Sequence, residues 1–216
     1  EVLNRVLRHD IRNDMNVVHG WLTELEAHVD DAGANALSNV RAAVSHTIAL
    51  TSEARDLAEV LTVGGDMPVE PVSLNGVLHR QVEKTREKYP HATVVVDGDV
   101  PAVSVVANQM LSSVFDNLLG NAVVHNDRDE PTVTISVADV GDDAIEVRVA
   151  DDGPGISDAL RSSLFGRGEK GVDSPGTGMG LYLVDELVAG YGGTVDVEDR
   201  EPRGTRFVVT LDRADA

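Results

Sequence analysis

The hydrophobic pattern of this chain changes once, at Gly64-Gly65, and that change constrains the fold more than any other feature. Before it, apolar residues recur at every third or fourth position, which predicts two amphipathic helices. Asp30, Asp31 and Gly33 separate the two stripes. The first stripe comprises Leu3, Leu7, Ile11, Met15, Val18, Leu22, Leu25 and Val29, and the second Leu37, Val40, Val44, Ile48, Thr51, Ala54, Ala58 and Leu61. We therefore expect residues 1–66 to form an antiparallel helical hairpin.

A helical hairpin alone buries too little apolar surface for a stable core. Two copies are therefore expected to pair into a dimeric four-helix bundle, which makes the chain a homodimer. The first residues already lie inside the helical pattern. We expect the chain to be a piece of a longer protein, with any sensor or membrane segment upstream of it.

From residue 67 onward, the pattern mixes helices and strands. Helices are predicted over about 73–89, 108–125 and 179–190, and strands over 93–97, 132–138, 145–150, 194–198 and 205–211. Because the strands and helices do not alternate as regular βαβ repeats, we expect residues 67–216 to form an α/β sandwich with a mostly antiparallel sheet. The chain as a whole is predicted to be α+β.

Composition excludes several classes of function. The net charge of −19 disfavours nucleic-acid binding, which requires a basic surface. The absence of cysteine excludes disulfides, zinc–thiolate sites and cysteine nucleophiles. No apolar run reaches the roughly 20 residues needed to span a bilayer, so we expect no membrane contact here and a cytoplasmic location. Strong acidity with three lysines resembles proteins of salt-loving organisms, although an ordinary acidic protein is the alternative.

The helix predicted over 108–125 carries two amides on one face. Asn117 and Asn121 are four residues apart, whereas Leu118, Leu119 and Ala122 are apolar and face the core. Neutral amide oxygens suit Mg²⁺, which takes few protein ligands beside phosphate oxygens. The alternative is a pair of exposed or capping asparagines.

Two glycine-containing segments follow. Asp151 stands at the end of a predicted strand, ahead of Gly153 and Gly155. A carboxylate there can accept a hydrogen bond from the exocyclic amine of adenine, and the glycines let the backbone approach the base. A plain turn is equally consistent with these residues. Gly176, Thr177, Gly178 and Gly180 precede a helix, whose N-terminal N–H groups can bind phosphate. Neither segment is a Walker A motif or a dinucleotide fingerprint. We interpret Gly192-Gly193 and Gly204-Thr205 as ordinary strand turns.

The first predicted helix carries a histidine away from its apolar stripe. At 100° per residue, His9 points roughly opposite Leu7 and Ile11, with Asp10 beside it and Asn13 one turn further on. An exposed imidazole can accept a phosphoryl group, and an adjacent carboxylate can orient it or take its proton. An ordinary solvated helix face is the alternative.

In this order, the motifs resemble the ATP-binding domain of the histidine kinase, gyrase, heat-shock chaperone and mismatch-repair ATPase superfamily, over about residues 73 to 211. By this resemblance Asn117 and Asn121 belong to the N box, with Asn121 as the Mg²⁺ ligand and His125 near the nucleotide. Asp151, Gly153 and Gly155 resemble the G1 box, in which the aspartate contacts adenine. Leu164-Phe165 resembles a shortened F box, and Gly176, Thr177, Gly178 and Gly180 resemble the G2 box.

The segment around His9 resembles the H box of sensor histidine kinases. The resemblance implies that His9 is the phosphoacceptor, Asp10 the general base and Asn13 a residue of phosphatase activity, in a dimerisation and phosphotransfer hairpin. It further implies Mg-ATP as the phosphoryl donor and the receiver domain of a response regulator as partner. Val124 departs from the family, which often has a lysine there; Arg167 or Lys170 is a candidate replacement.

Two other functions stay open from the sequence. A gyrase- or chaperone-like ATPase would use water as the phosphoryl acceptor, but position 117 is Asn rather than an acidic base. A non-catalytic scaffold with a degenerate nucleotide domain would agree with Val124 and the shortened F box.

Overall fold

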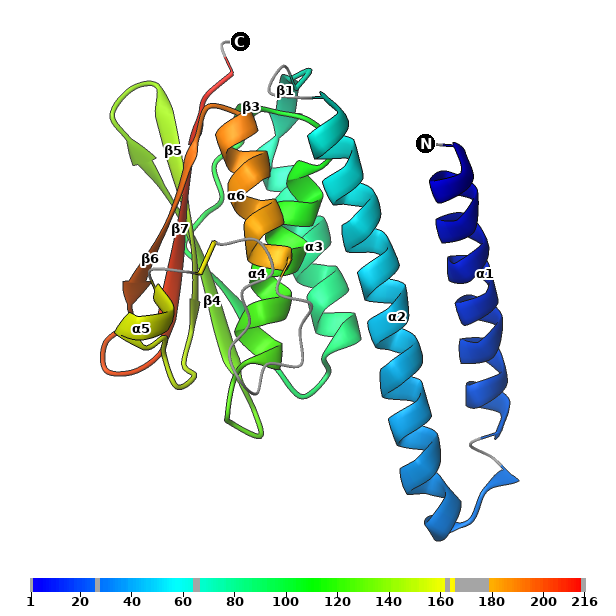
Figure 1. The fold of residues 1–216 in the computed structure, drawn as a ribbon. Coiled ribbons are helices and arrows are strands. Elements are labelled where there is room, and N and C mark those ends of the chain that lie inside the picture. The colour runs from blue at the N-terminus through cyan, green and yellow to red at the C-terminus, as the bar shows by residue number, and fades with distance from the viewer. Residues whose placement is uncertain (1, 26–27, 64–66, 162–163, 166–178, 215–216) are drawn as a thin grey trace. The chain divides into compact units, whose positions relative to one another are not determined.

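Two long helices make up the N-terminal part of the chain. In the computed structural model, which describes residues 2–25, 28–63, 67–161, 164–165 and 179–214, α1 (Val2–Leu25) and α2 (Asp31–Val63) run antiparallel (Figure 1). The chain divides into two compact units, residues 1–62 and 63–216. Both predicted helices are therefore present, whereas the four-helix bundle stays a prediction.

The helical unit buries little of its apolar stripe. Leu22 and Val44 are buried, but Ile11 is 43% exposed, Val40 46% and Trp21 66%. A groove of about 410 Å³ runs between the two helices, lined by Met15, Asn39, Val40, Ala43, Val44 and Thr47. None of the helices in the described ranges combines the length and the apolar character that a bilayer-spanning helix needs.

A five-stranded sheet forms the second unit, in the order β2-β4-β5-β7-β6. Its strands are β2 (Thr93–Asp97), β4 (Thr132–Val140), β5 (Ala144–Asp151), β6 (Thr194–Asp199) and β7 (Thr205–Asp212). β2 pairs parallel with β4, and the other three pairs are antiparallel. The prediction of a mostly antiparallel sheet is confirmed.

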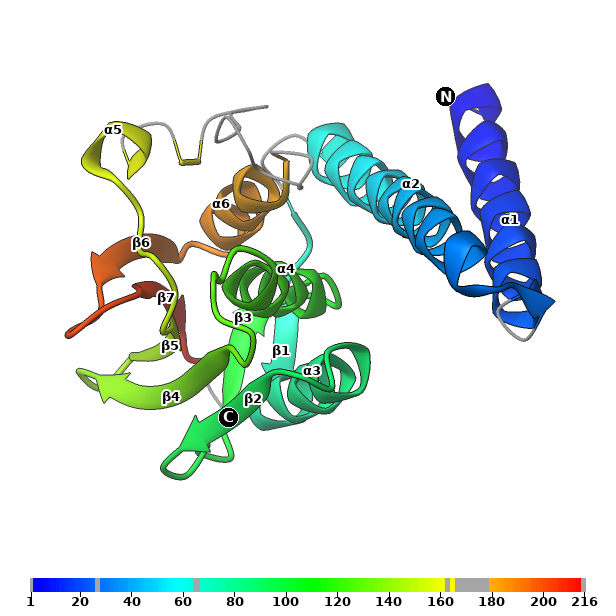
Figure 2. The same cartoon turned by 90° about the horizontal axis from the view of Figure 1, so that it is seen from below.

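Three helices cover one face of this sheet: α3 (Leu74–Lys88), α4 (Leu111–Val124) and α6 (Gly180–Gly190) (Figure 2). Their apolar faces bury Leu78, Phe115, Leu118 and Leu187 against the inward residues of the strands, such as Val147. α4 lies between the other two helices and contacts both of them as well as β4 and β5. It therefore occupies the centre of the core, which makes it a rigid support for the polar residues it carries.

Several element boundaries differ from the prediction. α4 begins at Leu111, three residues later than expected, because Asn108 Oδ1 accepts the Met110 N–H at 2.9 Å and holds residues 108–110 in a turn ahead of the helix. Ser73 caps α3, since its hydroxyl accepts the Gly76 N–H at 3.3 Å. The structure also contains three elements that were not predicted. They are α5 (Asp158–Arg161) and the antiparallel pair β1 (Glu70–Ser73) and β3 (Ser104–Ala107).

The start of the second unit is anchored to the end of α6. Asn108 Nδ2 donates to Pro68 O at 3.4 Å, and Asn108 Oδ1 accepts the hydroxyl of buried Tyr191 at 2.8 Å. Met67 fills the space beside Gly190, where an added Cβ would lie 3.1 Å from Met67 Cε. These contacts hold residues 67 and 68 against the C-terminal end of α6.

Candidate functional site

The C-terminal end of β5 places a buried carboxylate at the edge of the sheet. Asp151 is 8% exposed, and its Oδ1 accepts the N–H of Gly153 at 2.8 Å and the N–H of Thr205 at 3.3 Å. Within the described part of the chain, Asp151 Oδ2 accepts no hydrogen bond. One oxygen thus fixes the carboxylate and the other is available to a donor.

Burial dominates the electrostatics of this group. Desolvation raises the pKa of Asp151, and the hydrogen bonds from Gly153 and Thr205 offset that rise only in part. The neighbouring Asp152 raises the pKa further, whereas the charge of Arg200 lowers it. A desolvated carboxylate with a free oxygen is a strong acceptor for a buried N–H group.

Gly204 and Thr205 pack directly against Asp151, a contact that their interpretation as an ordinary strand turn did not include. Gly204 has φ +118°, and a Cβ added there would lie 1.9 Å from Asp151 O, so no other residue fits. Gly155, at φ +80°, approaches Gly204 O on the other side of the same turn. The starts of β7 and of the loop after β5 therefore meet around Asp151. A long-range contact of this kind leaves no signal in local sequence.

The two asparagines of α4 lie where that helix approaches α6. Asn117 Nδ2 donates to Ser113 O at 2.8 Å, and a Cβ added at Gly180 would lie 2.5 Å from Asn117 Oδ1. The first residue of α6 is therefore packed against the Asn117 amide, and any side chain at Gly180 would displace it. The structure thus brings Asn117 and Gly180 together from positions far apart in the sequence.

The half-buried Asn121 side chain makes no hydrogen bond to another described residue. Its amide oxygen is therefore available, and an amide oxygen is a suitable ligand for Mg²⁺. The described residues contain no cluster of three His, Asp or Glu side chains that could hold a metal. The donor set fits a Mg²⁺ ion that takes one protein ligand and most of its other ligands from phosphate and water.

His125 follows α4 directly, and its backbone N–H donates to Asn121 O at 3.0 Å. Nearby protein atoms partly desolvate the imidazole and lower its pKa, although the residue is exposed to solvent. At neutral pH the ring is therefore uncharged and can pack against a flat, neutral group.

Three of the predicted phosphate-binding residues, Gly176, Thr177 and Gly178, lie outside the described residues, as do Arg167 and Lys170. Gly180 is described and begins α6. Val124, which stands where a lysine is common in the family, is 44% exposed at the end of α4. Leu164 and Phe165 are half-buried.

The predicted phosphoacceptor segment lies on α1 in the first unit. His9 and Asp10 are both within this helix, and Asn13 is one turn beyond His9 with an exposed side chain. Residues 9 and 13 therefore share a face of the helix, as the spacing predicted.

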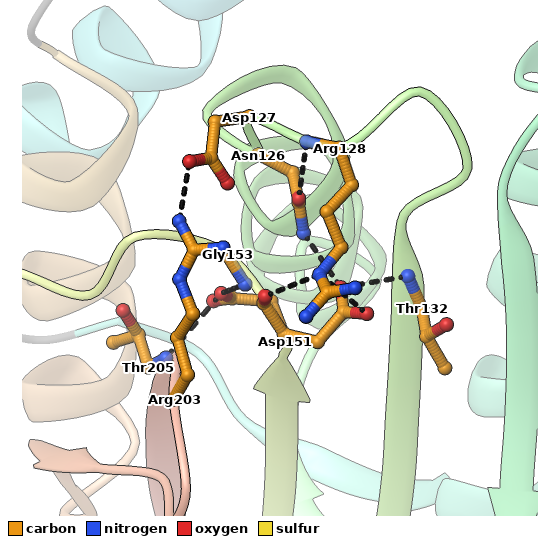
Figure 3. A network of polar contacts seen from close by, with 9 residues as sticks. Asn126, Asp127, Arg128, Thr132, Asp151, Gly153, Arg203 and Thr205 are labelled. Atoms are coloured by element: carbon orange, nitrogen blue, oxygen red, sulfur yellow. Dashed lines mark hydrogen bonds and ion pairs between the residues drawn. The ribbon is translucent and has the colours of Figure 1, made fainter.

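Residues that the sequence analysis missed form a polar network over the Asp151 turn (Figure 3). Asn126 and Arg128 both bind Asp152, and Asp127 pairs with Arg203 from the β6–β7 loop. The Asn-Asp-Arg sequence after the N-box helix was the only available signal, and it predicts no particular partner.

Comparisons with known proteins place the second unit in a family. Residues 107–215 match the model of the histidine kinase-, DNA gyrase B-, and HSP90-like ATPase family. The sensor histidine kinase AruS of Pseudomonas aeruginosa is 30% identical over 222 residues, which cover 96% of this chain and 22% of that protein. The probable sensor histidine kinase TcrY of Mycobacterium tuberculosis is 29% identical, over 94% of this chain and 44% of that protein. The chain thus spans less than half the length of these relatives.

Solved structures agree. The mycobacterial sensor histidine kinase MprB superposes with a TM-score of 0.62 at 26% identity and covers 69% of this chain and 100% of its own. Full-length ShkA in complex with AMPPNP superposes with a TM-score of 0.70 at 23% identity, over 99% of this chain and 46% of its own, which shows likeness of fold. Because the matching family model spans half of the chain, the chain belongs to the histidine kinase-, DNA gyrase B-, and HSP90-like ATPase family.

Proposed function

We propose that this chain is the core of an ATP-dependent protein histidine kinase. It phosphorylates His9 and passes the phosphoryl group to an aspartate in the receiver domain of a response regulator. The observation that carries the proposal is the free oxygen of Asp151, a buried carboxylate whose other oxygen is held by two backbone N–H groups. This oxygen can accept the exocyclic amine of adenine, and the kinase relatives supply the reaction class.

In the proposed site, different residues bind the base, the metal and the phosphates of the nucleotide. Asp151 selects the base, Gly153 and Gly155 shape the turn, and the neutral His125 is proposed to pack near the nucleotide. Asn121 would hold Mg²⁺, which neutralises phosphate charge when bound. Asn117, packed against Gly180, orients the start of α6, whose N–H groups and the preceding Gly176, Thr177 and Gly178 would hold phosphates.

The proposed chemistry is a direct phosphoryl transfer. The lone pair of an imidazole nitrogen of His9 attacks the γ-phosphorus as the bond from phosphorus to the β,γ-bridging oxygen breaks, so that ADP leaves. Asp10 accepts the proton from the other ring nitrogen. Asn13, on the same helix face, is proposed to hold the water that hydrolyses the phosphorylated regulator. We expect this chemistry in the cytoplasm, where ATP is available.

A second copy of the chain is the proposed occupant of the open face of the helical unit. The groove beside Met15 and Val40 is lined mainly by apolar atoms, and Ile11, Val40 and Trp21 are largely exposed in one copy. Burial of such a surface is the usual driving force for homodimerisation.

The ATPase alternative requires a carboxylate base for water near α4. The neighbouring acidic residue, Asp116, is paired with Lys84 of α3 at 2.9 Å. Position 117 is an amide, which cannot take a proton. These contacts favour transfer to a side chain over transfer to water.

One assay tests the proposal and both alternatives. The full chain is incubated with γ-labelled ATP, and the protein is examined for acid-labile, base-stable label. Label on the wild type that is lost in His9→Gln, while ATP binding persists, supports the kinase. Release of free phosphate without protein label would indicate an ATPase, and neither product would indicate a scaffold.

A further inference from the structure

Asn126, Asp127 and Arg128 follow one another shortly after α4, and each of them contacts a residue near the turn that follows Asp151. Asn126 Nδ2 donates to Asp152 Oδ1 at 2.9 Å. Arg128 Nε donates to Asp152 O at 3.0 Å and lies 3.2 Å from Asp152 Oδ2. Asp127 pairs with Arg203, ahead of β7. Figure 3 shows Asn126, Asp127 and Arg128 beside the turn that contains Asp151 and Gly153.

Asp152 is the centre of this arrangement. Besides the Asn126 amide, its Oδ1 accepts the backbone N–H of Thr132, the first residue of β4, at 2.9 Å. Its side chain is 20% exposed, against 48% for Arg128. Burial by itself raises the pKa of Asp152, but the hydrogen bonds from Thr132 and Asn126 and the charge of Arg128 outweigh it, and the pKa lies below its usual value. Asp152 is therefore ionised at neutral pH.

The contacts of Asp152 determine where the Asp151 carboxylate points. Asp151 Oδ1 is held by the N–H of Gly153, so the position of the free Oδ2 depends on the path of the backbone through Asp152. Asn126 closes the other side of Gly153, where an added Cβ would lie 3.3 Å from Asn126 Nδ2. A shift of the turn by a few tenths of an ångström would move Oδ2 relative to a bound base and weaken a directional hydrogen bond.

We propose that Asp152, held by Asn126 and Arg128, is a positioning residue that sets the preference of the site for adenine over purines without a 6-amino group. The inference rests on the nucleotide binding in the proposed function and extends it to a residue that contacts neither base nor phosphate. The clasp formed by Asn126, Arg128 and Asp152 is expected to orient this one hydrogen bond, so its loss should weaken the binding of ATP and leave the binding of a purine nucleotide without the 6-amino group nearly unchanged.

The test compares ATP with ITP, which has a carbonyl oxygen in place of the 6-amino group. Calorimetry on the full chain gives a Kd for each nucleotide in the presence of Mg²⁺, and the ratio of the two measures base discrimination. In the wild type we expect ATP to bind more tightly by about tenfold or more, because ITP leaves Asp151 unpaired. Asp152→Ala should bring the ratio to within about threefold of one, since the directional bond is lost.

Two further variants and a matched control make the result specific. Asp152→Asn keeps an oxygen that accepts from Thr132 and Asn126, so it should retain most of the discrimination. Asn126→Ser removes one bond while leaving Thr132 paired; it should lower the ratio partially and serves in place of Asp152→Ala if that variant does not fold. Asp139→Ala is the matched control, because Asp139 also pairs with an arginine, Arg213, but at the opposite end of β5 from Asp151.

The outcomes separate this inference from the function on which it rests. If Asp152→Ala and Asn126→Ser lower the thermal midpoint and weaken both nucleotides equally, the clasp is merely structural and the inference is wrong. If the wild type itself binds ATP and ITP alike, base recognition by Asp151 is wrong and the inference about Asp152 falls with it, whereas the proposed kinase activity is decided by the label. Protein label on His9 would still report kinase activity independently of either result.

Discussion

The helical unit and the sandwich unit bury their apolar residues to very different extents. Among the side chains that the structure describes, Leu22 and Val44 are the only buried apolar residues of the first unit, whereas the second has a continuous core around Phe115, Leu118 and Val147. Both units are amphipathic in sequence, so amphipathicity alone does not tell whether a unit completes its core. A helix pair has one apolar face each and needs further partners, while a sheet covered by three helices does not. The comparison predicts that the first unit depends on association and the second on internal packing.

The largest expected effect is on the core of the sandwich unit. Phe115→Ala should lower its free energy of unfolding by about 3–5 kcal/mol, because the ring is fully buried in α4 and its removal leaves a cavity. Urea denaturation followed by circular dichroism measures the change. Val124→Ala, on the same helix but 44% exposed, should cost less than about 1 kcal/mol. Similar losses for the two variants would contradict the assignment of the core.

The next effect concerns association of the helical unit. Val40→Asp should weaken dimerisation by at least about 2 kcal/mol, because it places a charge in an apolar interface beside the groove. Sedimentation over a concentration series, at high salt, gives the dissociation constant. Ser38→Asp lies about 200° away around α2 and should leave it unchanged. A wild type that is monomeric at micromolar concentration would overturn the dependence on a second copy.

Within the sandwich unit, Asp151→Asn should weaken ATP binding without lowering the free energy of unfolding. We expect ATP binding to weaken by about 1–3 kcal/mol, because the amide presents a poorer acceptor to the adenine amine. Stability should not fall, because burial raises the pKa of Asp151 and so already disfavours its ionised form in the folded protein. Asn121→Ala should instead keep ATP binding but make it insensitive to Mg²⁺ and lose phosphotransfer.

The raised pKa of Asp151 also sets a direction with pH. The pKa of Asp151 in the folded protein lies above the unfolded value of 3.8. The protonated Asp151 therefore contributes fully to the free energy of unfolding below pH 3.8, and this contribution is lost as the pH rises through the folded pKa. The difference in thermal midpoint between Asp151→Asn and the wild type should therefore grow from pH 4 toward neutrality.

Equal loss of ATP binding in Asp151→Asn and Asn121→Ala, with and without Mg²⁺, would show that both residues act through folding.

The smallest expected effect lies where the sandwich unit begins. Tyr191→Phe removes the hydroxyl that donates to Asn108 and should cost about 0.5–1.5 kcal/mol of stability while leaving ATP affinity unchanged. Tyr89→Phe is the control, because no described residue hydrogen-bonds to the Tyr89 hydroxyl. Thermal unfolding with nucleotide titration measures both quantities. A drop in ATP affinity for Tyr191→Phe alone would mean that this anchor reaches the nucleotide site.

Local periodicity was enough to predict most of the secondary structure. The apolar face of α4 and the alternation in β4, β5 and β7 follow from one side of each element being buried, whereas the stripes of α1 and α2 predicted these helices although much of their apolar surface is exposed in one copy. The Ser73 cap and the β2 boundaries were also predictable, since caps and strands have local chemistry. The short β1 and β3 were missed because each is stable only when paired with the other across more than 30 residues.

The identities of Asp151, Asn117 and Asn121 as candidate site residues came from the sequence alone, because motif chemistry resides in residue type and spacing. Only the tertiary structure decided which groups surround them. It placed Thr205 against Asp151 Oδ1, Gly180 against Asn117, and Asn126 and Arg128 against Asp152. Each of these contacts joins segments far apart in the chain. Their partners are chosen by the packing of sheet and helices, which brings the strand ends together, and no local pattern of residues records that choice.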